Sequence, residues 1–214
     1  MGIKERLHLL FLQWKNEILM HKKFILLSCV FLLITLVLNY LAGSYVARKV
    51  NNAVSDLILD NLPSINLSWM FYYGALILIL ITLIYVVFFK VNKIHAVIGQ
   101  GALLLLIRSF FICLTHLSTP EGAIISHAPR VFDFLDFQNA LFFSGHTAFP
   151  FLLFLIFRKE KIGIFFLIMS FVMAATVLLM HVHYSIDVFA AFFITYGSYK
   201  IGEKIISSIE KKSF

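Results

Sequence analysis

Residues 76–89, LILILITLIYVVFF, form an unbroken apolar run without a charged side chain. A helix needs about 20 apolar residues to cross about 30 Å of hydrocarbon, so this run and its flanks predict a membrane span near residues 69–89. Five further apolar runs lie near residues 24–46, 94–117, 140–157, 162–180 and 184–206. Continuous runs favour helices over the alternating strands of a membrane barrel. The sequence therefore predicts an all-α polytopic membrane protein, a bundle of six transmembrane helices.

The composition of the whole chain agrees with this setting. Of the 214 residues, 61% are hydrophobic and 14% are charged, and the mean hydropathy is +0.93. No linker, low-complexity tract or repeat interrupts the pattern, so residues 1–214 are expected to form a single membrane-embedded domain. Cys29 and Cys113 both fall inside predicted spans and are expected to be buried thiols, not disulfide partners.

The chain ahead of the first span has a pattern of its own, at residues 1–23. Its apolar residues recur at helical spacing between lysines: Leu7, Leu10, Phe11, Trp14 and Ile18. This pattern is typical of an amphipathic helix that lies in the membrane interface. The first span itself is too long for a signal-peptide core, so we expect it to remain in the mature protein.

The basic residues predict the orientation, because short cytoplasmic loops are enriched in Lys and Arg. With the N-terminus inside, 14 of the 18 basic residues face the cytoplasm. They are Lys4, Arg6, Lys15, Lys22, Lys23, Lys90, Lys93, Arg158, Lys159, Lys161, Lys200, Lys204, Lys211 and Lys212. Both termini are then cytoplasmic. The net charge of +7 is explained by the anionic inner leaflet and implies no nucleic-acid partner.

In this orientation two polar motifs share one depth on the extracytoplasmic side. SGHT at residues 144–147 lies near the start of the fourth span, and HVHYSID at residues 181–187 near the start of the sixth. Arg108 is 14 residues into the third span, or about 21 Å along the helix toward the same side. We therefore expect Arg108, His146, His183 and Asp187 to surround one pocket, since ionisable groups at membrane depth are usually functional.

The residue types in this pocket suit phosphoryl transfer. Asp187 follows His183 by four residues, which places both on one face of a helix, where the carboxylate orients the imidazole. A helix N-terminus after Ser144 and Gly145 favours an anion, with Thr147 as another donor. An arginine adds a planar fork for phosphate oxygens.

Both motifs resemble those of a known family. SGHT at 144–147 and His183-Tyr184-Ser185-Ile186-Asp187-Val188 resemble the SGHT and H-Y-[ST]-x-D-V motifs of the sphingomyelin synthase family, a branch of the type 2 phosphatidic-acid phosphatase superfamily. The resemblance implies that His183 is the nucleophile of a phosphohistidine intermediate, that Asp187 supports it, and that His146 transfers the proton. The predicted phosphate-binding residues are Arg108, Ser144, Gly145, Thr147 and Tyr184. No cofactor or metal ion is expected.

The same resemblance implies a phospholipid as donor and a ceramide- or diacylglycerol-like lipid as acceptor. A lipid-phosphate phosphatase, with water as acceptor, is the alternative, and a transporter or channel with a His/Asp proton or metal site is a third hypothesis. The chain departs from the family where Gln138-Asn139-Ala140 replaces Cys-Gly-Asp, and Arg108 lacks the Lys-x6-Arg-Pro context of the phosphatases. The headgroup, the acceptor and the oligomeric state are left open.

Other polar residues of the predicted outer loops are expected to be structural or solvated. The histidines are His181, at the edge of the pocket, and His116 and His127. The acidic residues are Asp56, Asp60, Asp133 and Asp136.

Overall fold

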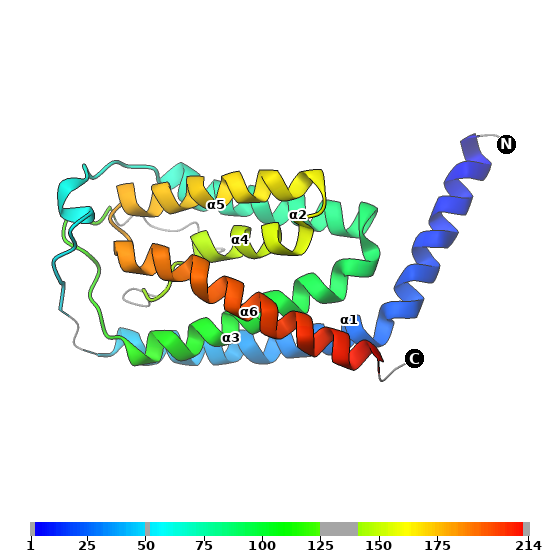
Figure 1. The fold of residues 1–214 in the computed structure, drawn as a ribbon, viewed down its shortest axis with the longest axis horizontal. Coiled ribbons are helices and arrows are strands. Elements are labelled where there is room, and N and C mark those ends of the chain that lie inside the picture. Colours follow the sequence, from blue (N-terminus) through cyan, green and yellow to red (C-terminus); the bar gives the residue numbers. More distant parts are fainter. Residues whose placement is uncertain (1–2, 50–51, 125–140, 212–214) are drawn as a thin grey trace.

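The structure is a computed structural model that describes residues 3–49, 52–124 and 141–211. Its long helices are α1 (Ile3–Ala47), α2 (Ala75–Phe89), α3 (Ile94–Leu114), α4 (Gly145–Phe157), α5 (Lys161–Leu179) and α6 (Ser185–Lys211), shown in Figure 1. The short helical turns Met70–Gly74 and Val91–Lys93 adjoin α2 and α3, and another, Leu59–Asn61, lies between α1 and α2. In the described residues the only β-type pairing is an isolated bridge between Asn52 and Leu117. The prediction of an all-helical protein is confirmed.

Within the described ranges, four helical segments are long and apolar enough to cross a membrane: Phe11–Ala47, Met70–Phe89, Val91–Leu114 and Lys161–Leu179. They support an integral membrane protein. Helix α4 is apolar but has 13 residues, a length of about 20 Å. It begins at Gly145 and not near residue 140, because Ser144 has an extended backbone and is the N-cap of the helix. The six-span bundle therefore remains a prediction.

The predicted interfacial helix and first span form one continuous helix, α1. Figure 1 shows that its N-terminal part leaves the bundle at an angle. The Trp14 indole donates a hydrogen bond to the Val87 carbonyl, near the end of α2, at 2.7 Å. This contact ties the projecting part to the bundle. The interfacial position of residues 1–23 remains a prediction.

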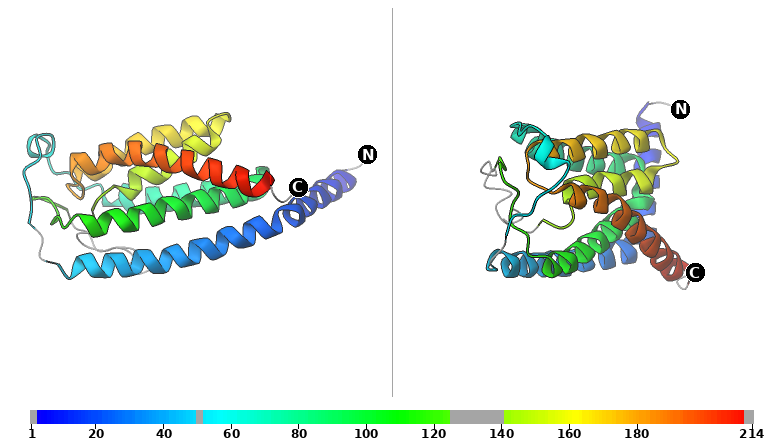
Figure 2. Two further views of the ribbon diagram at one scale, coloured as in Figure 1. Left: turned by 60° about the horizontal axis from the view of Figure 1, so that its bottom comes forward. Right: turned by 60° about the vertical axis from the view of Figure 1, so that its left-hand side comes forward.

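The helices pack in two groups that meet at α4. Helix α1 runs along α3, and α4 lies between α5 and α6 (Figure 1 and Figure 2). One apolar core joins α3, α4 and α6, through Leu104, Leu152 and Ala191. A second core joins α2, α4 and α5. Because α4 is shared by both cores, its first turn is fixed against α3 and α6.

The two ends of the bundle are built differently. The described parts of both termini lie at one end, where Glu160 pairs with Lys90 and Lys93 at 3.1 Å each. Burial raises the pKa of Glu160, but hydrogen bonds from Tyr85, Lys93 and Lys90 outweigh it and leave the pKa below its ordinary value. The opposite end is covered by residues 52–65 and 115–124, which we call the outer cap.

Candidate active site

The first polar motif forms the start of α4. Ser144 is the N-cap residue, and its Oγ accepts hydrogen bonds from the Thr147 amide at 3.4 Å and the Thr147 hydroxyl at 3.2 Å. Both side chains are fully buried. A Ser cap satisfies one of the amide groups that a helix start leaves without a partner in the helix. The amides of Gly145 and His146 follow the cap and favour an anion beside them.

The second motif forms the start of α6. Asp187 is fully buried, and its Oδ2 accepts a hydrogen bond from the Tyr184 amide at 3.0 Å. The same oxygen lies 3.4 Å from Nδ1 of His183. Tyr184 directly precedes the helix, so Asp187 supplies half of a capping box and orients the histidine at the same time. Within the described residues, Oδ1 of Asp187 has no hydrogen-bond partner.

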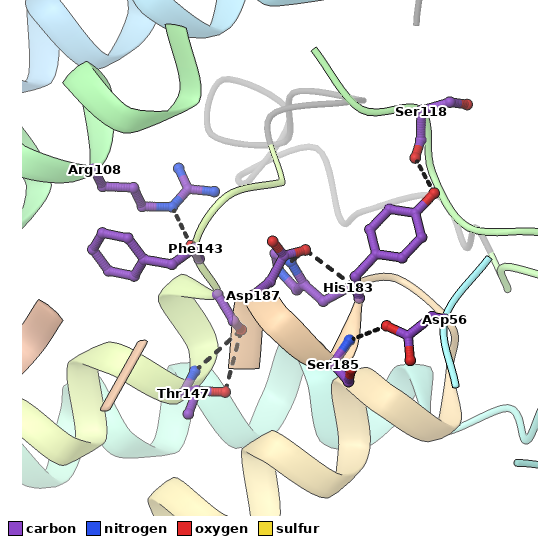
Figure 3. A network of polar contacts seen from close by, with 10 residues as sticks. Asp56, Arg108, Ser118, Phe143, Thr147, His183, Ser185 and Asp187 are labelled. Atoms are coloured by element: carbon purple, nitrogen blue, oxygen red, sulfur yellow. Dashed lines mark hydrogen bonds and ion pairs between the residues drawn. The ribbon is translucent and has the colours of Figure 1, made fainter. Parts of the chain in front are cut away.

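Three helices bring these motifs together. The Ser144 amide donates a hydrogen bond to the Asp187 carbonyl at 3.2 Å, which joins the start of α4 to the first turn of α6. Arg108 of α3 donates from Nε to the Phe143 carbonyl at 3.0 Å (Figure 3). A side chain at Gly145 would lie 3.6 Å from that Nε. This is an ordinary contact distance, so the arginine lies directly beside the start of α4.

The His146 side chain contacts an aromatic residue outside the two motifs. Its ring stacks on Phe71, with ring centroids 3.8 Å apart, in the turn that leads into α2. His146 lies near Arg108 and His183, and Arg108 lies near Asp187, close enough for charges on these groups to interact. The four ionisable residues predicted to share a pocket therefore interact electrostatically. Their catalytic roles remain predictions.

Comparison with known proteins bears on the same stretch of chain. A family model described as PAP2 superfamily C-terminal matches residues 139–204, which contain both motifs. The match supports the PAP2 superfamily. No curated protein and no solved structure matches the chain.

The PAP2 match supports a phosphatase or phosphotransferase type of lipid chemistry. The match does not distinguish the sphingomyelin synthase branch from the other branches of the superfamily. The matched region supplies His146, His183 and Asp187, whereas Arg108 comes from α3, outside it. The structure therefore places a positively charged side chain, Arg108, beside residues of the matched region.

Tyr184, predicted to bind phosphate, has a side chain that contacts the outer cap. The side chain is buried, and its hydroxyl donates to the Ser118 carbonyl at 3.0 Å and accepts from the Val54 amide at 3.2 Å. Both partners belong to the outer cap, so the phosphate contact of Tyr184 has no support here. Ser144 and Thr147 are likewise engaged with each other, in the helix cap.

Asp56 differs most from its sequence-based expectation. A solvated side chain is expected, but the carboxylate is buried and accepts hydrogen bonds from three backbone amides, those of Ile58, Leu59 and Ser185. Burial raises its pKa, but these hydrogen bonds outweigh burial and hold the pKa below its ordinary value. The Asp-x-x-Leu spacing at residues 56–59 is a local cap signal, but nothing local points to Ser185.

His181 holds the outer cap from a second point. Its Nδ1 lies 3.1 Å from the Glu121 carbonyl and its Nε2 lies 3.2 Å from the Leu62 carbonyl. The backbone at His181 has a φ of 54°, in the left-handed region that non-glycine residues seldom adopt. These contacts agree with the structural role expected for His181.

Several predicted features fall outside the described residues. They are Gln138, Asn139, Ala140, His127, Asp133 and Asp136. The described residues also contain Asp60, which is exposed as expected, and His116, which is exposed too. Cys29 and Cys113 are free thiols, partly exposed where burial was expected. In the described part of the chain, no three His, Cys, Asp or Glu residues are grouped to hold a metal ion.

An apolar groove of about 580 Å³ lies between α3 and α6. It is lined by Leu106, Ile107, Phe110, Phe111, Ile194, Gly197, Ser198 and Ile201. Arg108 lies on α3 between residues that line the groove, and Asp187 lies in the first turn of α6. A Cβ atom at Gly197 would meet nothing within 4 Å, so this glycine leaves space in the groove.

Proposed function

We propose that this protein is a membrane lipid phosphotransferase resembling the sphingomyelin synthase family, which moves a phospho-headgroup from a phospholipid to a ceramide- or diacylglycerol-like alcohol. The observation that carries the proposal is the His183 and Asp187 pair. Asp187 faces Nδ1 at 3.4 Å, so a proton on Nδ1 leaves the Nε2 lone pair available for phosphorus. The PAP2 match supports this type of chemistry.

In the first step Nε2 of His183 attacks phosphorus, and the bond between phosphorus and the diacylglycerol oxygen breaks. The leaving oxygen takes a proton from His146, which acts as general acid. His183 becomes a phosphohistidine that keeps its Nδ1 proton, and the carboxylate of Asp187 stabilises the resulting positive charge. Arg108 and the amides at the start of α4 balance the charge on the phosphoryl oxygens.

In the second step the acceptor hydroxyl gives its proton to the neutral His146 and attacks phosphorus. The bond between phosphorus and Nε2 breaks, and its electron pair returns to His183. Both histidines end in their starting states. Water in place of the lipid alcohol gives the phosphatase alternative with the same residues, and the choice between the two is left to the assay.

The groove between α3 and α6 suits an acyl chain of the lipid donor. Its lining is apolar, and its two helices carry Arg108 and Asp187. A lipid whose phosphate is held at these residues can therefore place a chain along the groove. We propose that the site faces the extracytoplasmic side. Lys90 and Lys93, which pair with Glu160, lie at the opposite end of the bundle, and lysines are enriched on the cytoplasmic side.

The proposal is tested in proteoliposomes with a headgroup-labelled phospholipid, with and without ceramide. Label should move to ceramide, or appear as a water-soluble headgroup phosphate if water is the acceptor. His183→Ala should lower kcat at least about 100-fold, while His116→Ala, at an exposed histidine, should keep the rate. A phosphohistidine should be trapped by rapid quenching in the parent protein and not in His183→Ala.

The third hypothesis, a transporter or channel with a metal or proton site, is separated in the same system. A chelator should leave the transfer rate unchanged. Loss of transfer with the chelator and its return with zinc would favour a metal site. An ion flux across the proteoliposomes without label transfer would replace the enzyme proposal by the transporter hypothesis.

A further inference from the structure

Asp56 connects the outer cap to the helix that carries Asp187. Its Oδ2 accepts a hydrogen bond from the Ser185 amide at 2.7 Å, across 129 positions of the chain (Figure 3). Its Oδ1 accepts from the amides of Ile58 and Leu59 at 3.0 Å each. The carboxylate is thus anchored in the cap by one oxygen and holds the first residue of α6 with the other.

A second contact holds the neighbouring residue of the site. The Tyr184 hydroxyl accepts from the Val54 amide at 3.2 Å and donates to the Ser118 carbonyl at 3.0 Å. The two consecutive residues between His183 and Ile186 are therefore both bound to the outer cap. His183 lies directly before them and Asp187 two residues after Ser185. Any movement of this segment changes the relation between the two proposed catalytic side chains.

The His183 and Asp187 pair is sensitive to such movement. Its 3.4 Å separation is already beyond the usual range of about 2.7 to 3.2 Å for a nitrogen to oxygen hydrogen bond. A further small displacement abolishes the interaction that selects the Nδ1 tautomer. The negative charge of Asp56 also lies at the positive end of α6, where a carboxylate is stabilised.

We infer that Asp56 is a positioning residue for the transfer reaction: by binding the Ser185 amide it holds residues 183–187 so that Asp187 faces His183. The inference rests on the proposed function. Asp56 acts through Ser185 and does not itself touch the reacting atoms. Helix α6 has other anchors, because Asp187 caps the Tyr184 amide and α6 packs against α3 and α4, so we expect Asp56 variants to fold.

The test compares Asp56→Asn with Asp60→Asn. Both changes remove one carboxylate charge from the same cap segment. Asp60 is exposed, and its carboxylate accepts a hydrogen bond from the Asp56 amide within the cap itself, so it serves as the matched control. In Asp56→Asn an amide nitrogen replaces one carboxylate oxygen, so either the Ser185 amide or the pair from Ile58 and Leu59 loses its acceptor.

Two measurements are made on each variant in lipid nanodiscs. Hydrogen exchange of a peptide that covers residues 182–188 reports whether the segment is held. The single-turnover rate of phosphohistidine formation, together with steady-state kcat and KM, reports whether loss of this hold slows the reaction. We expect faster exchange and a fall in kcat of about tenfold or more in Asp56→Asn, with KM within about twofold, because small misplacements of reacting groups are strongly felt in rate. Asp60→Asn should match the parent in both.

The outcomes separate this inference from the proposed function. Unchanged exchange both in Asp56→Asn and in Asp56→Ala, which leaves the Ser185 amide no acceptor at this position, overturns it, and so does faster exchange with unchanged kcat. A rise in KM with unchanged kcat overturns it as well, since that result assigns Asp56 to substrate binding. If the parent protein transfers no label, the proposed function fails, while the exchange comparison still decides whether Asp56 holds the segment.

Discussion

Replacement of Asp187 by asparagine tests the support of the proposed nucleophile most directly. The parent carboxylate is fully buried, 3.4 Å from Nδ1 of His183. When His183 bonds to phosphorus its ring becomes positively charged. At an effective dielectric constant of about 20, opposite charges at the 3.4 Å separation attract by about 5 kcal/mol. The Asp187→Asn change removes that attraction and permits the wrong tautomer of His183.

The magnitude follows from this energy. Tenfold in rate corresponds to about 1.4 kcal/mol, and neighbouring dipoles offset part of the attraction, so kcat is expected to fall between about 10²-fold and 10⁴-fold. Stability should change little. The amide oxygen of the asparagine still accepts from the Tyr184 amide, and Arg108 keeps its hydrogen bond to the Phe143 carbonyl, so both groups retain a partner.

The assay is label transfer in proteoliposomes at saturating lipid, with thermal unfolding measured on the same preparations. The melting temperature of Asp187→Asn should lie within about 3 °C of the parent, the equivalent of about 1 kcal/mol in a protein of this size. The matched control is Glu203→Gln, an acid-to-amide change in the same helix at an exposed ion pair with Lys200. A folded Asp187→Asn variant that keeps kcat within about fivefold of the parent refutes the reasoning.

The described contacts support three more predictions. Arg108→Lys keeps the charge but loses the planar fork, so we expect KM for the phospholipid to rise about tenfold; an unchanged KM and rate would return Arg108 to a packing role. Gly197→Leu fills open space in the groove between α3 and α6. It should lower kcat/KM for long-chain lipids about tenfold and change it little for a short-chain donor. Equal effects on both donors would exclude an acyl chain from the groove. The pKa of Asp56 is held below its ordinary value, so its contribution to stability is complete above the unfolded-state pKa of about 3.9 and is lost as the pH falls through the folded-state pKa. Thermal unfolding measured from about pH 6 down to about pH 3 should therefore decline less steeply in Asp56→Asn than in the parent, and parallel curves would contradict the assignment.

Much of the site was predictable because its signals are local. Ser144, Gly145 and His146 carry a recognisable helix start, and the four-residue spacing of His183 and Asp187 places them on one face of a helix. Arg108 was predicted from depth alone, because the rise of a helix converts residue number into distance. For these residues the spacing along the chain is enough to predict their positions on or along a helix.

The contacts of the outer cap were not predictable in this way. The sequence presents Asp56 as a surface acid and Tyr184 as a phosphate contact, yet Asp56 binds the Ser185 amide and the Tyr184 hydroxyl binds Val54 and Ser118. These partners are separated by 66 to 130 positions. Which loop covers which helix end depends on the path of the whole chain, and no periodicity records it.

The sequence by itself determined the helical segments and the identity of the ionisable residues, because in hydrocarbon the backbone must satisfy its own hydrogen bonds and a continuous apolar run does so as a helix. Tertiary structure alone decided which side chains meet. The α4 start is joined to α6 by the Ser144 amide, Arg108 is directed to the Phe143 carbonyl, and Asp56 is buried at the first residue of α6. Each of these is a hydrogen bond between distant segments, formed only because packing of the helices brings their ends together.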